Sequence, residues 1–253
     1  MVIGVILAAG KGSRMKLKDA NKTSVFFNGK PLIQYGVTLF QNTADKTVIV
    51  VGAHAESVKE SISLHDGIHF AEQKHRLGTG HAVRVAAETM KTFHTEPQFV
   101  LVGYGDHMMF YTEKVINQLI ELHKKQTATL SLITTTYKDP NFLAWGRIVR
   151  SQKNGKEIER IVEQKDATEE ERAITEINPG FYCFDYQFLK KALKDMTKSP
   201  ITKEYYLTEL IEIASKYNGK IVGLKVPFKY VGIGINTKEQ LGESISLYNE
   251  KSV

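Results

Sequence analysis

The sequence predicts an α/β protein with a Rossmann-like, mostly parallel sheet flanked by helices and an inserted subdomain that contains a β-hairpin. Three observations predict this fold. Short apolar runs alternate with amphipathic segments through the first half of the chain. A glycine-rich loop follows the first apolar run directly. In the second half, two alternating runs flank an Asn-Gly pair, which is typical of a hairpin turn.

In the first half, we expect strands where apolar and β-branched residues are continuous, at 2–8, 46–52, 68–73, 98–106 and 127–137. Helical spacing of apolar residues predicts helices at 31–42, 54–63, 78–93 and 112–126. Pro31 fits the first turn of the first of these helices, and Thr79 is the expected N-cap of the third. Strand and helix alternate, which predicts parallel strands with helices on both faces.

In the second half, residues 146–164 are two alternating runs around Lys153-Asn154-Gly155. The further expected elements are helices at 166–173, 203–219 and 236–251 and strands at 180–185 and 220–227. Gly219 fits the position after a helix end, and Asn236 or Thr237 fits the cap of the closing helix. The sequence contains no internal repeat and no linker, so we expect a single domain over 1–253.

Composition narrows the classes of function. The chain has 253 residues, 42% hydrophobic and 25% charged, with a formal charge of +6. Its basic residues are scattered among acids, which favours phosphate-bearing metabolites, or an ordinary charged surface, over nucleic acid. One cysteine, Cys183, allows no intrachain disulfide. No segment is typical of a secretory leader or a membrane span, so we expect a cytoplasmic protein without membrane partners.

The loop "LAAGKGSRM", residues 7–15, is the first candidate site. Glycines let backbone N–H groups approach a phosphate, and Lys11 and Arg14 add positive charge. In an open parallel sheet, ligands bind beyond the carboxyl ends of the strands, where this loop lies. The loop matches neither G-x-x-x-x-G-K-[ST] nor G-x-G-x-x-G. From the loop alone, a phosphate site and a tight strand-to-helix turn are both open.

The same loop resembles the opening signature of the sugar-phosphate nucleotidyltransferases. Further stretches are similar to one branch, the bacterial uridylyltransferase domain that makes UDP-N-acetylglucosamine. They are "NKTSVFFNGKPLI", "AEQKHRLGTGHAV", "YGDHMMF", "GRIVR", "IVEQKDA", "EINPGFY", "EYYLTEL" and "GIN", in the family's order and at about its spacing. The resemblance covers essentially the whole chain.

The resemblance implies Mg²⁺-dependent transfer of a nucleotidyl group from a triphosphate, with UTP expected, to a sugar 1-phosphate, with release of pyrophosphate. The first expected acceptor is N-acetylglucosamine 1-phosphate. Residues 1–110 would mainly bind nucleotide, 111–227 would mainly bind the acceptor, and 228–253 would form the metal-site loop and the closing helix. No stretch resembles the hexapeptide-repeat β-helix that follows in the bifunctional enzymes, so we expect no acetyl transfer, and no oligomeric state is implied.

The resemblance also implies a role for individual residues. The expected catalytic cations are Arg14 and Lys22, and the expected Mg²⁺ ligands are Asp106 and Asn236. The expected nucleotide-binding residues are Leu7, Ala8, Ala9, Gly10, Gly12, Gln73, Gly78, Thr79, Tyr104 and Gly105. The expected acceptor-binding residues are Gly146, Glu163, Asn178 and Thr208.

Each polar residue also has an ordinary structural interpretation. Lys22 could be a solvated lysine, Gln73 a surface residue beside a turn, and His81 a packing residue. Asp106 could form a turn and Asn236 could cap a helix. Glu163 could be an exposed strand residue.

The chain departs from the family pattern at four places. Asn21 replaces the usual proline before Lys22, which we expect to loosen that loop. His107-Met108-Met109 replaces x-P-L, and Pro179 replaces a small hydroxylated residue. The segment before Gly146 is about two residues longer and gains Trp145, a possible wall of the acceptor site. The last two of these departures fall in the acceptor half. The acceptor could therefore also be a sugar 1-phosphate with a different C2 substituent, or a non-sugar phosphate or phosphonate.

Two other functions are compatible with part of the sequence. One is a cytidylyltransferase that uses CTP and a small phosphorylated or phosphonate acceptor. The other is an inactive nucleotide-sugar sensor or regulatory subunit, although a sensor has no need of a metal pair. A dehydrogenase is disfavoured because the second strand ends in Gly52-Ala53-His54, without the acid that binds a ribose.

Overall fold

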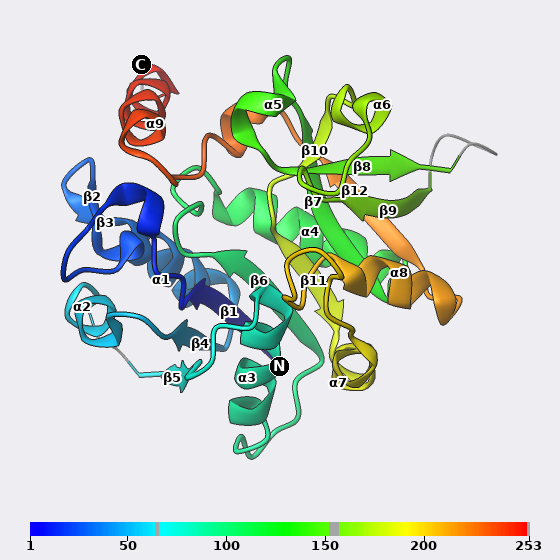
Figure 1. The fold of residues 1–253 in the computed structure, drawn as a ribbon. Helices are drawn as coiled ribbons and strands as arrows, with labels where there is room; N and C mark the ends of the chain where they lie inside the picture. The colour runs from blue at the N-terminus through cyan, green and yellow to red at the C-terminus, as the bar shows by residue number, and fades with distance from the viewer. Residues whose placement is uncertain (64–65, 152–156, 252–253) are drawn as a thin grey trace.

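The computed structural model describes residues 1–63, 66–151 and 157–251, and its framework is one large sheet (Figure 1). In order across the sheet, the strands are β5 (Ile68–Glu72), β4 (Lys46–Val51), β1 (Val2–Ala8), β6 (Phe99–Tyr104), β11 (Tyr182–Asp185), β7 (Leu130–Thr136), β10 (Glu176–Asn178), β8 (Gly146–Arg150) and β9 (Ile158–Val162), with β12 (Ile221–Lys225) also paired to β7. A separate two-stranded hairpin pairs β2 (Phe26–Phe27) with β3 (Lys30–Pro31).

The strands β5, β4, β1 and β6 are parallel, as the alternation of strands and helices predicts. Val5 of β1 lies opposite Val48 of β4 on one side and Val102 of β6 on the other. The next strand, β11, runs antiparallel and separates β6 from β7. The predicted Rossmann-like sheet is therefore confirmed, with the antiparallel strand β11 at its centre and further antiparallel pairs among β7, β10, β8 and β9.

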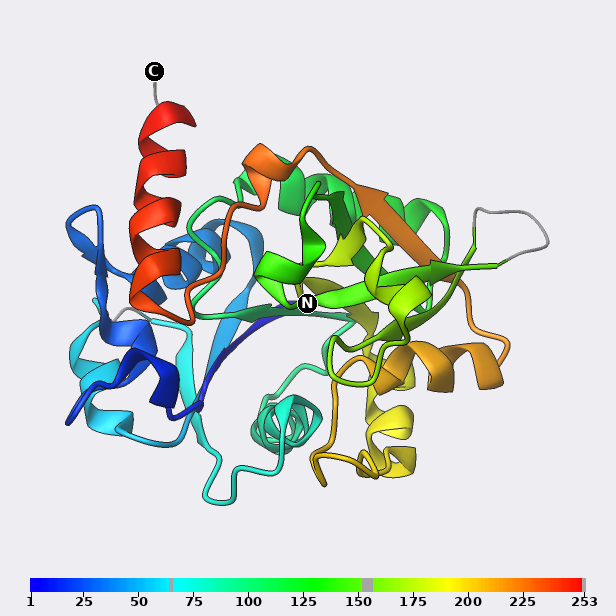
Figure 2. The same ribbon diagram turned by 45° about the horizontal axis from the view of Figure 1, so that its top comes forward.

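Helices cover both faces of this sheet. One face carries α3 (Thr79–Met90), α7 (Tyr186–Asp195) and α8 (Glu209–Lys216), and the other carries α1 (Leu32–Thr43), α2 (Ala55–Glu60) and α4 (Glu113–Lys125). In Figure 2, α3 lies on the opposite side of the sheet from α1 and α4. The shorter α5 (Pro140–Leu143) and α6 (Glu169–Arg172) flank β8, and α9 (Lys238–Lys251) ends the described chain.

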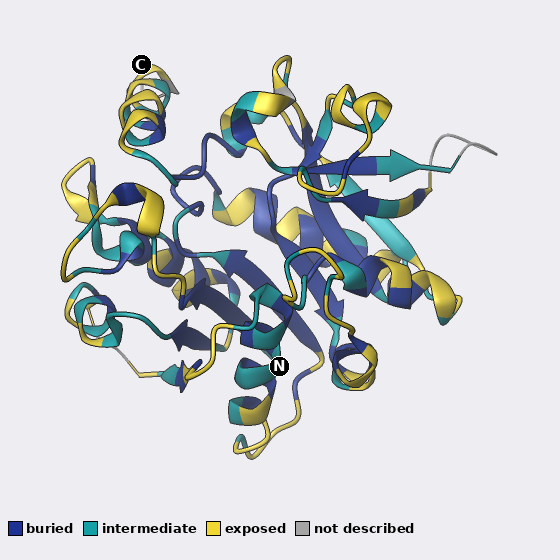
Figure 3. Cartoon of the chain, in the orientation of Figure 1, coloured by how far each residue is buried: buried dark blue, intermediate teal, exposed yellow. Residues whose placement is uncertain are grey.

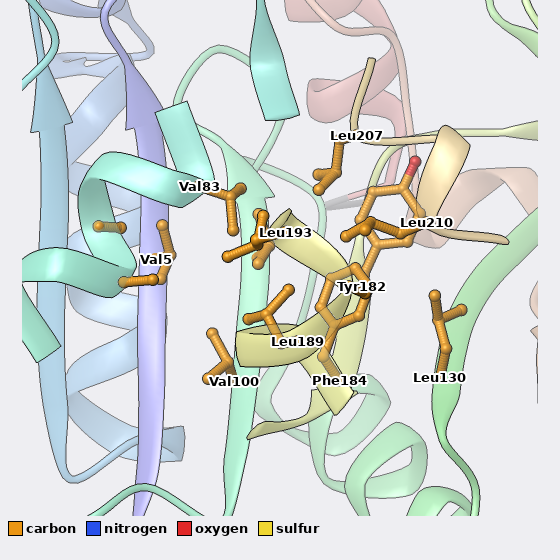
Figure 4. Packing of buried hydrophobic residues seen from close by; sticks show 14 of the residues in the cluster. Val5, Val83, Val100, Leu130, Tyr182, Phe184, Leu189, Leu193, Leu207 and Leu210 are labelled. Carbon is orange, nitrogen blue, oxygen red and sulfur yellow. The ribbon is translucent and has the colours of Figure 1, made fainter. Parts of the chain in front are cut away.

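Two apolar layers hold the helices to the sheet. Alternate residues of β1 enter different layers because successive side chains of a strand point to opposite faces. Val5 packs in the layer that contains Val83 and Leu189, part of which Figure 4 shows. Ile6 packs in the layer that contains Phe40 of α1. The central strands are thus buried on both sides, while exposed residues lie on the outer helix faces and loops (Figure 3).

Several expected helix boundaries are wrong. Pro31 precedes α1 instead of lying in its first turn, because it belongs to β3. Thr79 is not the cap of α3, since Gly78 occupies that position and the Thr79 hydroxyl accepts from the N–H of Leu207. Helix α8 begins only at Glu209, and Asn218, with φ of 56°, takes the left-handed conformation expected at Gly219.

Other differences concern whole elements. Helix α7 and strand β10 were not expected, although the apolar residues of α7 have helical spacing. Strands β8 and β9 pair antiparallel, as a hairpin requires. The predicted turn at Lys153-Asn154-Gly155 lies outside the described residues.

Candidate active site

The candidate site lies where the parallel strands end. The loop after β1, the end of β6 and the N-terminus of α3 share this edge of the sheet. The backbone N–H of Gly105 donates to the carbonyl oxygen of Leu7 across 3.0 Å, which joins the ends of β6 and β1. The N–H of Ile235 donates to the carbonyl oxygen of Asp106 across 3.0 Å. This bond brings the segment before α9 to the same edge, beside the loop after β1 (Figure 2).

The glycine-rich loop folds tightly onto the segment that contains Lys22. Gly12 has a φ of 62°, and a Cβ atom at this position would lie 2.7 Å from the Lys22 Cβ. Both observations require glycine at position 12. Glycine is thus needed here because of the backbone conformation and the packing against Lys22. Gly12 does not line the cavity described below.

The buried side chain of Asn21 holds the same loop in place through hydrogen bonds. Its buried Nδ2 lies 3.0 Å from the carbonyl oxygens of Ala8 and Gly10 and 2.9 Å from that of Ala53. Its Oδ1 accepts from the backbone N–H and the hydroxyl of Thr23. The expectation that Asn21 loosens the loop is therefore wrong, because its amide supplies donors that a proline lacks.

Four predicted residues meet beside this loop. The ammonium group of Lys22 forms an ion pair with the Oδ2 of Asp106, and it donates to the Oδ1 of Asn236 across 2.8 Å. Arg14 donates to the same Asn236 oxygen across 3.0 Å. The side chains of Lys22 and Asp106 are 14% and 15% exposed, so their charges are largely withdrawn from water. Lys22 is thus not a solvated surface lysine.

The cap of α9 is Thr237, one of the two residues expected there. Its hydroxyl accepts from the N–H of Gln240 across 3.1 Å. The Oδ1 of Asn236 points instead toward Lys22 and Arg14. Asn236 is therefore available as a polar ligand in the site.

A cavity of about 520 Å³ opens above these residues. Its lining includes most of the predicted nucleotide-binding residues: Leu7, Ala8, Ala9, Gly10, Gln73, Gly78, Thr79 and Tyr104. Lys11 lines it too, as expected for the glycine-rich loop, whereas two further charged lining residues, Arg76 and Glu204, were not predicted to act there. Arg76 lies between Gln73 and Gly78 in the chain, so its position in that motif was an available signal. Gly105 is buried behind the cavity and does not line it.

Gln73 is buried at the wall of this cavity, so it is not a surface residue. Its Nε2 donates to the carbonyl oxygen of Gly78 across 3.0 Å and lies 3.0 Å from the Nδ1 of His81. Gly78 has a φ of 103°, and a Cβ atom there would lie 2.5 Å from the carbonyl oxygen of Tyr205. Glycine is therefore required for this turn into α3.

A second cavity, of about 190 Å³, shares Tyr104 and Asp106 with the first. Gly146, Glu163 and Asn178, three of the predicted acceptor-binding residues, line it. Thr208 does not, but its hydroxyl donates to the Oε1 of Glu163 across 2.9 Å. Burial raises the pKa of Glu163, although the bond from Thr208 opposes the rise. Glu163 is thus an enclosed carboxyl with few partners of its own.

Three of the four departures from the family pattern lie together beside this smaller cavity. The Nδ1 of His107 lies 2.9 Å from the carbonyl oxygen of Pro179, and its Nε2 lies 3.3 Å from that of Gly232. The Trp145 ring packs on the His107 ring with 4.5 Å between centroids. Trp145 also lines the cavity, as expected. One imidazole therefore connects the segments that contain Asn178, Trp145 and Asn236.

The oxygen atoms of Asp106 and Asn236 suit a hard divalent cation. Both contact a single positively charged atom, the Lys22 nitrogen, so one cation can touch both oxygens. Magnesium is bound in proteins by one or two such oxygens together with phosphate oxygens and water. Over residues 1–63, 66–151 and 157–251, no group of three histidine, cysteine or acidic side chains is arranged to hold a metal. Further oxygens for an ion here would come from a bound phosphate or from water.

The fold and this site together define a nucleotide-binding α/β protein, with a glycine-rich loop and paired cations at the carboxyl ends of parallel strands. The model of the nucleotidyl transferase family matches residues 3–223, and the chain belongs to this family. In the described part of the chain, no helix is both long and apolar enough to cross a bilayer.

Curated relatives extend this result. The chain is 40% identical over 244 residues to the bifunctional protein GlmU of Acetivibrio thermocellus, a match that covers 96% of this chain and 50% of the relative. It is 39% identical over 248 residues to the bifunctional protein GlmU of Oceanobacillus iheyensis, covering 98% and 52%. The chain thus spans about half the length of these relatives.

Solved structures share the fold. A UDP-glucose pyrophosphorylase complexed with UDP-glucose superposes with a TM-score of 0.73 at 18% identity, covering 98% of both chains. A putative glucose-1-phosphate thymidylyltransferase from Bacillus anthracis gives the same TM-score at 17% identity, covering 98% of this chain and 95% of that one. At these identities, the likeness concerns the fold.

Proposed function

We propose that this chain transfers a uridylyl group from UTP to a sugar 1-phosphate and releases pyrophosphate. The observation that carries the proposal is the group of Lys22, Arg14, Asp106 and Asn236 around one point. Asp106 and Asn236 also border the smaller cavity, and Asp106 borders the larger one. Two anionic substrates held in the two cavities would therefore meet at cations. The resemblance of the sequence motifs to the bacterial uridylyltransferase domain supports UTP as the donor, and the similarity to bifunctional GlmU is consistent with it.

The larger cavity suits a nucleoside triphosphate. Its cationic lining residues outnumber its carboxylates: Lys11, Arg14, Lys22 and Arg76 against Asp106 and Glu204. The backbone of the loop at Ala8, Ala9 and Gly10 would lie against the phosphates and the base. The N-terminus of α3 at Gly78 and Thr79 adds favourable potential for negative charge. Gln73 would contact the edge of the base.

The smaller cavity suits the sugar part of the acceptor. None of its lining residues within the described chain is a lysine or an arginine, while Glu163 and Asn178 supply polar atoms for hydroxyl groups. Thr208 would hold the Glu163 carboxyl in position, and Gly146 would leave room beside it. N-Acetylglucosamine 1-phosphate is the first acceptor to test.

The chemical step needs little acid–base catalysis. An oxygen of the acceptor phosphate, already ionised at neutral pH, would attack the α-phosphorus and form the new P–O bond. The bond from that phosphorus to the β-phosphate oxygen would break, and pyrophosphate would leave with its electron pair. Lys22 and Arg14 would reduce repulsion between the two anions and stabilise charge on the leaving group. The residues therefore act through position and charge.

Asp106 and Asn236 would hold the Mg²⁺ ion through one oxygen each. When bound, the ion would supply positive charge on phosphate oxygens. Lys22 would then exchange its contacts with these two oxygens for contacts with phosphate.

The test is release of pyrophosphate. The purified chain is mixed with MgUTP or MgCTP and a panel of sugar 1-phosphates and small phosphorylated alcohols, with and without EDTA. We expect turnover with UTP and at least one sugar 1-phosphate, and its loss with EDTA. Turnover that requires CTP would replace the proposal with a cytidylyltransferase. Binding of nucleotide without turnover of any acceptor would favour a sensor.

A further inference from the structure

We propose that His81 is a positioning residue that, with the Gly78 carbonyl, fixes the Gln73 amide so that the site selects uracil over cytosine. This inference rests on the proposed function, because it concerns the base of the nucleotide in the larger cavity. The sequence suggested that His81 is only a packing residue, but a packing role does not account for its contact with the Gln73 amide.

The geometry fixes which way the Gln73 amide faces. Its terminal nitrogen lies 3.0 Å from the carbonyl oxygen of Gly78, which can only accept a hydrogen bond. The reverse orientation would place two oxygens in contact. The nitrogen also lies 3.0 Å from the Nδ1 of His81. Both protons of the amide nitrogen therefore have partners inside the protein.

His81 must accept this second bond. Because the Gln73 nitrogen can only donate, the Nδ1 of His81 has to be unprotonated, with the ring proton on Nε2. Burial, and then the charges of Arg84 and His75, lower the pKa of His81. The neutral ring that the contact requires is thus the stable form near neutral pH.

The consequence concerns the Gln73 oxygen. Among the described residues it has no hydrogen-bond donor, while Gln73 lines the larger cavity. An oxygen fixed in this way can only accept a hydrogen bond, so the base must supply the donor. Uracil has an N–H at position 3, whereas cytosine has a lone pair there, so the same contact attracts one base and repels the other.

The experiment measures binding, which does not depend on the acceptor. Affinities for MgUTP and MgCTP are determined by calorimetry for the full chain and for His81→Leu, His81→Asn and His69→Leu. The asparagine Oδ1 can take the place of the histidine Nδ1, so it should keep the hydrogen bond. His69 is a partly buried histidine on β5 that does not line either cavity, and its variant is the matched control.

We expect His81→Leu to reduce the ratio of UTP to CTP affinity about fivefold, the usual effect of one lost hydrogen bond. His81→Asn and His69→Leu should leave the ratio within twofold of the parent. A purely structural effect of the leucine would weaken both nucleotides alike and keep the ratio. In a Gln73→Ala background, His81→Leu should no longer change the ratio, because the two residues act through one contact.

The outcomes separate this inference from the proposed function. If neither nucleotide binds to the parent chain, the proposed function itself fails. If both bind and His81→Leu leaves their ratio unchanged, the proposed function stands and the role of His81 is overturned. A change in ratio that persists in the Gln73→Ala background would also overturn it.

Discussion

The side-chain nitrogen of Asn21 lies 3.0 Å from the carbonyl oxygen of Gly10, which closes the glycine-rich loop onto the residue before Lys22. The carbonyl oxygens of Ala8 and Ala53 contact the same amide, so the glycine-rich loop and the segment after β4 both depend on one buried side chain.

Replacing Asn21 by aspartate tests this arrangement. Asn21→Asp keeps the oxygen that accepts from Thr23 but sets a second oxygen against three carbonyls. We expect the free energy of unfolding to fall by about 2–3 kcal/mol and the KM for UTP to rise about tenfold, with the KM for the acceptor little changed. Urea denaturation and initial rates measure the two effects. Asn28→Asp, at an exposed turn, is the control, and equal effects in both variants would contradict the argument.

Removing the charge of Asp106 tests the metal site. In Asp106→Asn, the side chain keeps its shape, but the ion pair with Lys22 and the anionic ligand are lost. We expect pyrophosphate release to fall by about two to three orders of magnitude, with a weaker dependence on the Mg²⁺ concentration. Asp19→Asn, an exposed aspartate on the loop before Lys22, should retain parental activity. Activity of Asp106→Asn within tenfold of the parent would exclude Asp106 as a ligand.

Glu163 is the best residue with which to test the acceptor pocket. Glu163→Gln keeps the size of the side chain and can still accept from Thr208. We expect the KM for the sugar 1-phosphate to rise about tenfold while the KM for UTP is unchanged. The reason is that a carboxylate oxygen accepts stronger hydrogen bonds from sugar hydroxyl groups than an amide oxygen does. Initial rates with each substrate varied in turn distinguish the two. Glu212→Gln, at an exposed position on α8, should behave as the parent, and a rise in the KM for UTP would contradict the assignment.

The stability of the fold should depend on His123 in mildly acidic solution. Burial lowers the pKa of His123 to about 4, although the charge of Asp185 opposes the shift. Between about pH 6.5 and 4, the unfolded chain takes up a proton that the folded chain does not. The free energy of unfolding should therefore fall as the pH falls through this window, by up to about 1.4 kcal/mol per pH unit.

Urea denaturation at pH 7 and pH 5 measures this dependence. His123→Asn should reduce the loss of stability between the two pH values, because its side chain does not titrate and can still bond Ser131. His94→Asn, at an exposed position, should show the same loss as the parent. An unchanged pH dependence in His123→Asn would show that the histidine does not cause it.

Local pattern was enough to predict the regular part of the fold. Strand β1 was predicted from a continuous apolar run and helix α4 from a helical spacing of apolar residues. Both patterns are visible within the segment itself and do not depend on distant residues. The position of β11 between β6 and β7 was not predicted, because strand order is decided by packing between distant segments. Helix α7 was missed even though Asp185 caps it and Phe188, Leu189 and Leu193 lie on one helical face. That signal was present in the sequence.

The site was predictable to a different degree. The edge shared by Asp106 and the glycine-rich loop follows from parallel strands, whereas the contact of Asn236 with Lys22 joins residues 214 positions apart. Only the resemblance to the family connected them. The support from Asn21 and the contact of His81 with Gln73 came from the structure, because a hydrogen bond between loops leaves no periodic trace in a sequence.

The contact of His107 with the backbone carbonyl oxygens of Pro179 and Gly232, and the packing of the tilted Trp145 ring against its imidazole, have a consequence for redesign. The His107 side chain contacts both of the other unusual positions, the ring of Trp145 and the backbone of Pro179. Exchanging His107 would remove the ring that packs on Trp145 and the side-chain partner of the Pro179 carbonyl oxygen, whereas an exchange at position 179 would keep that oxygen. Redesign of this wall of the smaller cavity would therefore need to change positions 107 and 145 together.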